Sequence, residues 1–541
     1  MTSVDSTGGD ILKKLALICI AISFMFIYVG CRITGKAPEG LIKKDSNEIE
    51  KEEEFSSSLL IEENNEDVKA DTNSTNSINQ QNISLYFWNK ENNKLVCETR
   101  SLITSDTNLS INDIIVELLR GPESKDLQPV IPIQTKVIDI DQTDNIVTVN
   151  FSEDFLGAED LLVARTALVN TLTERQGIKY VKILINGQEL TSDGTQEGEP
   201  LGVLSKSTNN IDELLAASNR QKDENTVKQI NRELFFRDFR GQYLLSEVRA
   251  ITVKNGGIAR AIIEELIKGP VETSTGLYPV LPQGTQLLDI NLIDSEDDNS
   301  KVIALYFSKE LKAPFLDQVV TSRGDMEPDP KIIKDKVEEI KDKENVILSS
   351  IVYSLSGLNN VSGVKIYYQD RSGNYTDAPL YSIDLKKPLT TKDFPNKLGR
   401  KIKIYFANEN ATHLVPDYRA MSRQNLQIAR TIIDELILGP REGTGQKAVI
   451  PADISRGDIK VWMDDSNTRV IVDLPAKLDG SKMGSTGTLM TLYAIVNSLT
   501  DPANTSNVKE VQFLVEGKVV KTFGNLEFSE PFIRNPAIIQ E

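Results

Sequence analysis

The sequence predicts three tandem small domains of the α+β class, each built from β-hairpins and two helices. One short pattern, apolar at helical spacing and ending in Gly-Pro, is written three times: Ile114–Pro122, Ile262–Pro270 and Ile432–Pro440. The same succession of strand-like and helical segments surrounds each copy. The copies lie roughly 150 to 170 residues apart, a period that indicates domains with their own cores and not a solenoid of small units.

Each copy of the pattern reads as the end of an amphipathic helix. Glycine accepts a backbone conformation that other residues avoid, and proline cannot continue the helical hydrogen bonds. We therefore expect the glycine of each copy to end the helix in a left-handed conformation and to stabilise its domain. The glycine–proline pairs are Gly121 and Pro122, Gly269 and Pro270, and Gly439 and Pro440.

The first repeat gives the order of elements. Alternating apolar residues predict a hairpin of 83–88 with 94–100, and Ser110 is the expected N-cap of the first helix. A second hairpin, a second helix and a final strand follow the Gly-Pro stop, and Asn186-Gly187 favours a tight turn. These later elements span 136–141, 145–151, 158–175 and 180–185.

The other two repeats follow the same order. We place the domains at 83–192, 230–370 and 400–525, with polar segments at about 191–228 and 371–398 separating them. The second repeat carries a charged insertion between Lys309 and Asn345, directly before its second helix at 346–355. Insertions are tolerated as surface excursions. A disordered surface loop is the favoured interpretation of the insertion, and a short partner-binding helix is the alternative.

The N-terminus predicts export and membrane attachment. Lys13-Lys14 precede an apolar run from Leu15 to Gly30, and Cys31 follows. A basic flank before an apolar stretch is typical of an exported N-terminus, with the positive side kept inside. Residues 1–31 are thus a lipoprotein signal with lipidation at Cys31, an uncleaved transmembrane anchor, or a plain signal peptide. Tyr28 stands where lipoprotein signals favour leucine. All three alternatives place the body outside the cytoplasm.

Residues 32–82 are rich in Glu, Asn, Ser and Lys, with too few apolar residues to offset the entropy of ordering. We expect a disordered acidic linker there. The net charge of the whole chain, −18, argues against a nucleic-acid partner, because such affinity depends on clustered Lys and Arg. Three cysteines, two of them in or beside the leader, exclude a disulfide framework.

No catalytic chemistry emerges from the sequence. The single histidine, His413, takes the place of Lys94 and Tyr243 in the other repeats, so it belongs to no shared chemistry. Cys97 corresponds to Ser246 and Pro416 and reads as a half-buried strand residue. Catalytic triads, phosphate loops and metal-ligand spacings are not written in the chain. We predict a protein that is no enzyme and needs neither cofactor nor metal.

All three repeats share a carboxylate and an arginine two residues apart on one strand, and therefore on one face. The pairs are Glu98 with Arg100, Glu247 with Arg249, and Asp417 with Arg419. A surface or cross-strand ion pair is the preferred interpretation, and a polar ligand site is the alternative. Acidic turns also recur, at 141–144, 294–298 and 464–465. Calcium is one interpretation of these turns, although Asp and Asn are favoured in any hairpin turn.

Together, the Leu-x-x-Gly-Pro helix end, the Val-Ile-Pro loop, the strand 147–152 and the helix segment 168–173 resemble the GerMN domain of spore-germination and sporulation proteins. The resemblance covers all three repeats. It implies a compact α+β fold similar to the ring-building motifs of secretion and sporulation channels. It also implies a membrane-attached, non-enzymatic role in sporulation, germination or cell-envelope assembly. The large insertion, and three domains where two are common, depart from the family pattern.

We therefore expect a membrane-anchored, extracytoplasmic assembly protein. Its modules would bind other envelope or sporulation proteins through strand edges and helix faces, and self-assembly is possible in such a protein. The alternative function is a cell-wall module that recognises peptidoglycan through the shared acid and arginine pairs.

Overall fold

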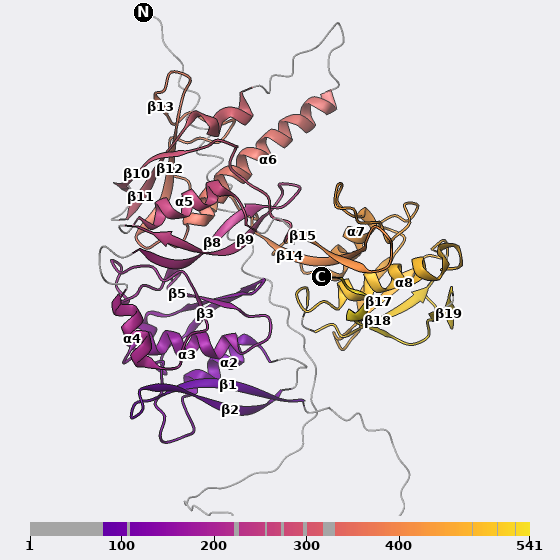
Figure 1. The fold of residues 1–541 in the computed structure, drawn as a ribbon, viewed down its shortest axis with the longest axis horizontal. Coiled ribbons are helices and arrows are strands. Elements are labelled where there is room, and N and C mark those ends of the chain that lie inside the picture. Colours follow the sequence, from indigo (N-terminus) through magenta and orange to yellow (C-terminus); the bar gives the residue numbers. More distant parts are fainter. Residues whose placement is uncertain are drawn as a thin grey trace, which may run out of the picture. The chain divides into compact units, whose positions relative to one another are not determined.

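The computed structural model describes residues 79–104, 109–220, 227–254, 257–271, 275–295, 300–316, 330–478, 480–505, 507–524 and 526–540. Three repeated α+β units follow one another, and we call them module 1 (79–220), module 2 (228–398) and module 3 (399–540) (Figure 1). Three hydrophobic cores form, each supplied almost entirely by one module. The predicted fold class and the threefold repeat are confirmed.

Module 1 shows the plan of the fold. Its elements are β1 (Asn79–Asn89), β2 (Lys94–Thr104), α2 (Ile111–Arg120), β3 (Val137–Thr143), β4 (Ile146–Phe151), η1 (Glu153–Gly157), α3 (Leu161–Thr173), β5 (Tyr180–Ile185), β6 (Gln188–Glu189), β7 (Val203–Ser205) and α4 (Ile211–Arg220). Strands β1 and β2 form a sheet of their own. In the second sheet β3 pairs antiparallel with β4, and β4 pairs parallel with β5 after the crossover through α3.

Helices α2 and α3 of module 1 lie between the β1–β2 hairpin and the second sheet (Figure 1). This placement explains why α3 is buried on all sides, continuously from Val163 to Leu172, including its polar residues Asn170 and Thr171. Helix α2 keeps one polar face, as an amphipathic helix at the edge of the layer should. Ser110 caps α2 in a capping box with Asp113, which confirms the predicted helix start.

Modules 2 and 3 repeat the plan. Module 2 consists of β8 (Lys228–Arg237), β9 (Leu244–Val253), α5 (Ile258–Lys268), β10 (Leu287–Asp294), β11 (Lys301–Phe307), η3 (Lys309–Phe315), α6 (Pro330–Leu355), β12 (Val361–Gln369), β13 (Tyr375–Thr376) and η4 (Thr391–Asp393). Module 3 consists of β14 (Gly399–Ala407), β15 (Leu414–Ser422), α7 (Ile428–Leu438), β16 (Lys460–Met463), β17 (Arg469–Leu474), α8 (Gly480–Leu499), β18 (Glu510–Val515), β19 (Thr522–Phe523), β20 (Leu526–Glu527), β21 (Phe532–Ile533) and η5 (Pro536–Ile538).

The polar segments between the repeats also fold onto the module that precedes them. Each module has a strap after its last long strand, at 199–211, 386–398 and 526–540. The strap forms hydrogen bonds with that strand and then returns to the first hairpin of the same module. In module 2, for example, Leu389 exchanges two backbone hydrogen bonds with Val364, and the amide of Leu244 donates to the carbonyl of Lys397 at 2.8 Å. Composition hides these straps because they bury only a few apolar residues, among them Phe394.

The described C-terminal part of the insertion of module 2 differs from the favoured prediction of a disordered loop, and residues 317–329 lie outside the described residues. Its part from Pro330 onward is helical and continuous with the second helix, giving α6 26 residues. Two buried side chains explain the extension. Ile340 joins the core of the module, and the Glu344 carboxylate accepts hydrogen bonds from the amides of Tyr381, Ser382 and Ile383.

The predicted anchor, with Cys31, and nearly all of the predicted linker lie outside the described residues. Among the residues that the structure describes, no helix combines the length and apolar character needed to cross a membrane.

Candidate functional site

The arginines of the shared pairs reach the C-terminal ends of the first helices. Arg100 on β2 donates through Nη1 to the carbonyl of Glu117 at 3.1 Å and through Nη2 to that of Gly121. Arg249 makes the same two contacts, with Glu265 at 3.3 Å and Gly269 at 2.8 Å. The last carbonyls of a helix lack partners within it and carry partial negative charge. A guanidinium supplies both the missing donors and the opposite charge.

A carboxylate of its own strand and one of the first helix pair with each arginine, and in module 1 Glu123 lies 3.7 Å from Arg100 as a third. Arg100 pairs with Glu98 at 2.6 Å and with Glu117, on α2, at 3.2 Å. Arg249 pairs with Glu247 at 2.5 Å and Glu265 at 2.9 Å. Each module therefore contains one unit that we call the Gly-Pro corner. It consists of the arginine, the carboxylate on the same strand, the glutamate of the first helix and the Gly-Pro pair that ends this helix. Module 3 builds it from Asp417, Arg419, Glu435, Gly439 and Pro440.

The strand carboxylate also holds the chain that leaves the helix. In module 1, Glu98 accepts the amide hydrogens of Glu123 and Ser124, both at 3.1 Å. Burial raises the pKa of Glu98, but the hydrogen bonds from Arg100 and from these two amides outweigh it, so the pKa is lowered. In module 2, Glu247 accepts the amide of Val271 at 3.0 Å.

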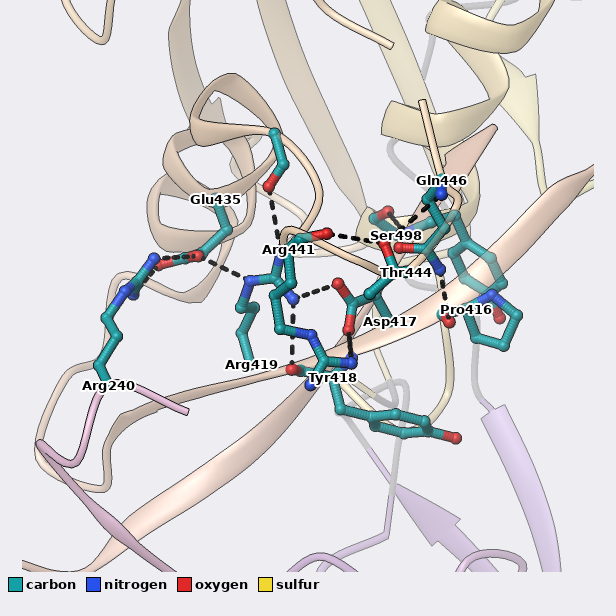
Figure 2. A network of polar contacts seen from close by, with 12 residues as sticks. Arg240, Pro416, Asp417, Tyr418, Arg419, Glu435, Arg441, Thr444, Gln446 and Ser498 are labelled. Atoms are coloured by element: carbon teal, nitrogen blue, oxygen red, sulfur yellow. Dashed lines mark hydrogen bonds and ion pairs between the residues drawn. The ribbon is translucent and has the colours of Figure 1, made fainter. Parts of the chain in front are cut away.

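In module 3, different groups bind the two carboxylates of the corner. Asp417 is one methylene shorter than glutamate and pairs with the Arg441 side chain at 2.5 Å. Glu435 receives two hydrogen bonds, at 2.7 and 2.9 Å, from Arg240 of the turn between β8 and β9. Figure 2 shows the resulting series of alternating charges, Arg240, Glu435, Arg419, Asp417 and Arg441. The bond to Glu435 raises the pKa of Arg240.

The glycines of the corner have positive φ values of 86°, 82° and 83° in Gly121, Gly269 and Gly439. Their ψ values lie near 180°, however, so the predicted left-handed helical conformation is wrong in ψ. The proline that follows explains the difference, because it disfavours helical ψ in the residue before it. This region of positive φ and extended ψ is essentially restricted to glycine. A Cβ on Gly121 would meet Pro129 at an ordinary 3.6 Å, so conformation and not space selects glycine here.

Sequence reasoning missed two further polar positions of the second helix. A buried hydroxyl accepts a backbone amide of the first strand in every module: Thr171 from Tyr86, Ser354 from Phe235 and Ser498 from Tyr405. The residue before it holds the strap, since Asn497 accepts the amide of Asn535 and donates to the same residue's carbonyl. Asn170 does the same with Ser207. The shared motif 168–173 contains both positions and was the available signal.

The remaining sequence candidates are spread apart. His413 lies exposed in the turn between β14 and β15 and contacts Thr412. Cys97 is on β2 as expected, but it is exposed and not half-buried, because the helices pack mainly against β1. Asp144 adopts a positive φ of 53°, as a hairpin turn requires. Within the described ranges, no three His, Cys, Asp or Glu side chains are grouped to hold a metal ion.

The fold and the Gly-Pro corners together define a class of protein. Its members consist of small α+β modules in tandem, and the charged residues that the modules share stabilise the fold of each module. The chain belongs to the family described as Germane, sporulation and spore germination, whose model matches residues 84–191, 233–372 and 403–521, more than half of the chain. The resemblance seen in the sequence is thereby confirmed. The family is one of sporulation and germination proteins and is no known enzyme class.

Solved structures are similar to parts of the chain. The tandem GerMN domains of the sporulation protein GerM from Bacillus subtilis match at 19% identity over 57% of this chain and 100% of that one, with a TM-score of 0.21. The first GerMN domain of the same protein matches at 24% identity over 24% and 97%, with a TM-score of 0.19. The crystal structure of a putative lipoprotein from Clostridium perfringens matches at 21% identity over 25% of this chain and 93% of that one, with a TM-score of 0.17. No curated protein matches.

Proposed function

We propose that this chain is a membrane-anchored, extracytoplasmic and non-enzymatic assembly protein of sporulation or germination, whose modules bind other envelope proteins. Family membership supports the process. The basic residues and apolar run before Cys31 support the anchor and the location of the body. The Gly-Pro corners support a structural use of the shared charges, because their arginines donate to carbonyls and carboxylates of their own modules.

The observation that carries the protein-binding part is the edge strand β10 of module 2. Within the part of the chain that the structure describes, it pairs with β11 on one side only and is the outermost strand of its sheet. Three apolar side chains on it are exposed: Leu288 by 37%, Leu292 by 65% and Ile293 by 39%. A free backbone edge with apolar side chains pairs readily with another strand, and natural proteins usually cover or charge such an edge. This supports a protein partner at β10.

A photo-crosslinking amino acid at Leu292, introduced in the native sporulating cell, tests the proposal. We expect one discrete crosslinked protein of the envelope. The same amino acid at Lys518, an exposed position of module 3, is the matched control and should give no such product. Crosslinking to cell-wall glycan, or the same products from both positions, would contradict the proposal.

The anchor is tested separately. Metabolic lipid labelling that disappears in Cys31→Ser supports the lipoprotein form. Unlabelled protein that still sediments with membranes supports the uncleaved anchor, and protein that sediments in neither form contradicts membrane attachment.

A further inference from the structure

The Gly-Pro corner of module 3 is occupied by a turn from module 2. Phe239 and Arg240 form the tip of the turn between β8 and β9. The Arg240 guanidinium binds both oxygens of Glu435, and the Phe239 ring lies 5.1 Å from the guanidinium carbon of Arg419 (Figure 2 shows the polar contacts). The tip is already shaped for this contact, because the Asp238 carboxylate accepts the amides of Arg240, Gln242 and Tyr243.

Arg240 takes a position that the other modules fill from within their own helix. In module 1, Arg120 pairs with Glu117 three residues before it, at 2.7 Å. In module 2, Lys268 pairs with Glu265 at 2.5 Å with the same spacing. Module 3 has Leu438 at that place, and its side chain is 53% exposed. Because its own helix has Leu438 and no cation at this place, Glu435 binds Arg240, a cation from outside module 3.

The corner of module 2 is the more open version of this arrangement. The side chain of Arg249 is 11% exposed, against 1% for Arg419. Arg419 lies between the rings of Phe406 and Phe239, whereas the described part of the chain places a ring, that of Phe236, over only one face of Arg249. Beside it, Val271 is an apolar residue 72% exposed, where module 1 has Glu123 and module 3 has Arg441.

We propose that the Gly-Pro corner of module 2 is a docking site for a protein turn that carries an aromatic residue followed by arginine. The arginine displaces Lys268, a side chain 65% exposed, and binds Glu265, while the ring covers Arg249 and Val271. Guanidinium suits this carboxylate better than ammonium, because its planar fork binds both oxygens together. The contact between modules 2 and 3 supplies the chemistry of the partner. This proposal names a partner for the protein-binding function, on which it rests.

A cyclised peptide with the sequence of residues 237–244, added to the full chain, tests the site by calorimetry. The corner of module 3 is already filled, so the wild type should bind about one peptide. The double variant Phe239→Ala with Arg240→Ala frees both Glu435 and the face of Arg419, and it should raise the stoichiometry to about two, which serves as the positive control. Peptides lacking the phenylalanine or the arginine should lose affinity about tenfold or more.

Two variants locate the site. Lys268→Ala removes an exposed competitor and should strengthen binding without disturbing the fold. Glu265→Gln should weaken it about tenfold or more, and Glu117→Gln in module 1 is the matched control that should change nothing. Binding of the peptide to the double variant Phe239→Ala with Arg240→Ala but not to the wild type overturns the proposal. An affinity that is the same in Lys268→Ala as in the wild type overturns it too. Because this assay needs neither membrane nor cell, it can fail while the crosslinking at Leu292 succeeds.

Discussion

The Gly-Pro corners of modules 1 and 3 solve one structural problem with different surroundings. In both, an arginine on the second strand of the hairpin donates to the carbonyl of the helix-ending glycine. Around it, module 1 relies on backbone amides that bind Glu98, whereas module 3 relies on two further arginines, Arg240 and Arg441. The arginine and the glycine carbonyl are therefore the fixed part, and the groups that bind the carboxylates vary from module to module.

Removal of the arginine should give the largest effect and the sharpest contrast. Arg100→Met leaves Glu98 and Glu117 with Arg120 as the nearest remaining cation, so we expect a loss of about 3–5 kcal/mol in module 1. Arg419→Met should destabilise module 3 less, because Arg240 and Arg441 still balance Glu435 and Asp417. Urea unfolding, monitored in each module by hydrogen exchange, measures the free energy of unfolding of modules 1 and 3 in both variants. An equal loss in the two modules would contradict the compensating role of the extra arginines.

Gly269→Val should cause the second-largest loss of stability. Valine must adopt a φ of 82° with extended ψ, at a cost of about 1–3 kcal/mol. Because the cores are separate, module 2 should melt earlier while modules 1 and 3 keep their stability. Gly457→Ala is a suitable control, since a Cβ there meets nothing within 4 Å. A stability of module 2 equal to that of the wild type would mean that the glycine serves contact with a partner.

Converting the surroundings of one corner into those of the other tests the comparison directly. Glu98→Asp shortens the carboxylate and should cost module 1 about 1 kcal/mol through the lost amide hydrogen bonds. Adding Glu123→Arg, which imitates Arg441, should restore part of this loss. The free energy of unfolding of the single and double variants decides the matter. If module 1 is less stable in the double variant than in Glu98→Asp alone, the arrangement of module 3 cannot replace that of module 1.

Acid gives the smallest expected effect. The pKa of Glu98 is lowered from an ordinary 4.5, so its contribution to stability is present above that value and is lost as the pH falls through the lowered pKa. Glu265 in module 2 has a pKa lowered in the same direction, against burial, by Lys268 and Arg249. Below about pH 4.5, Glu98→Gln should flatten the decline of module 1 while leaving module 2 as in the wild type. Unfolding curves at several pH values check this.

The sequence predicted the parts that depend on neighbours along the chain. Ser110, the repeated Gly-Pro and the strand spacing of Glu98 and Arg100 are local signals, and the local structure follows them. The missed parts depend on distant contacts. Glu117 sits among apolar helix residues and reads as a solvent-facing position until Arg100 is placed over it. Phe394, isolated in a polar segment, gives no periodicity, yet it is fully packed in the core of module 2.

The strap of module 2 has a mechanical consequence. Lys397 is bonded to the first hairpin of module 2, and β14 of module 3 begins at Gly399, so almost no slack separates the two. Tension applied to module 3 by a partner therefore passes straight into that backbone hydrogen bond and along the strap to the bridge between Leu389 and Val364. If the membrane anchor proposed above holds the other end of the chain, this seam bears the load, and peeling the strap from module 2 pulls Leu389 and Phe394 out of that module's core.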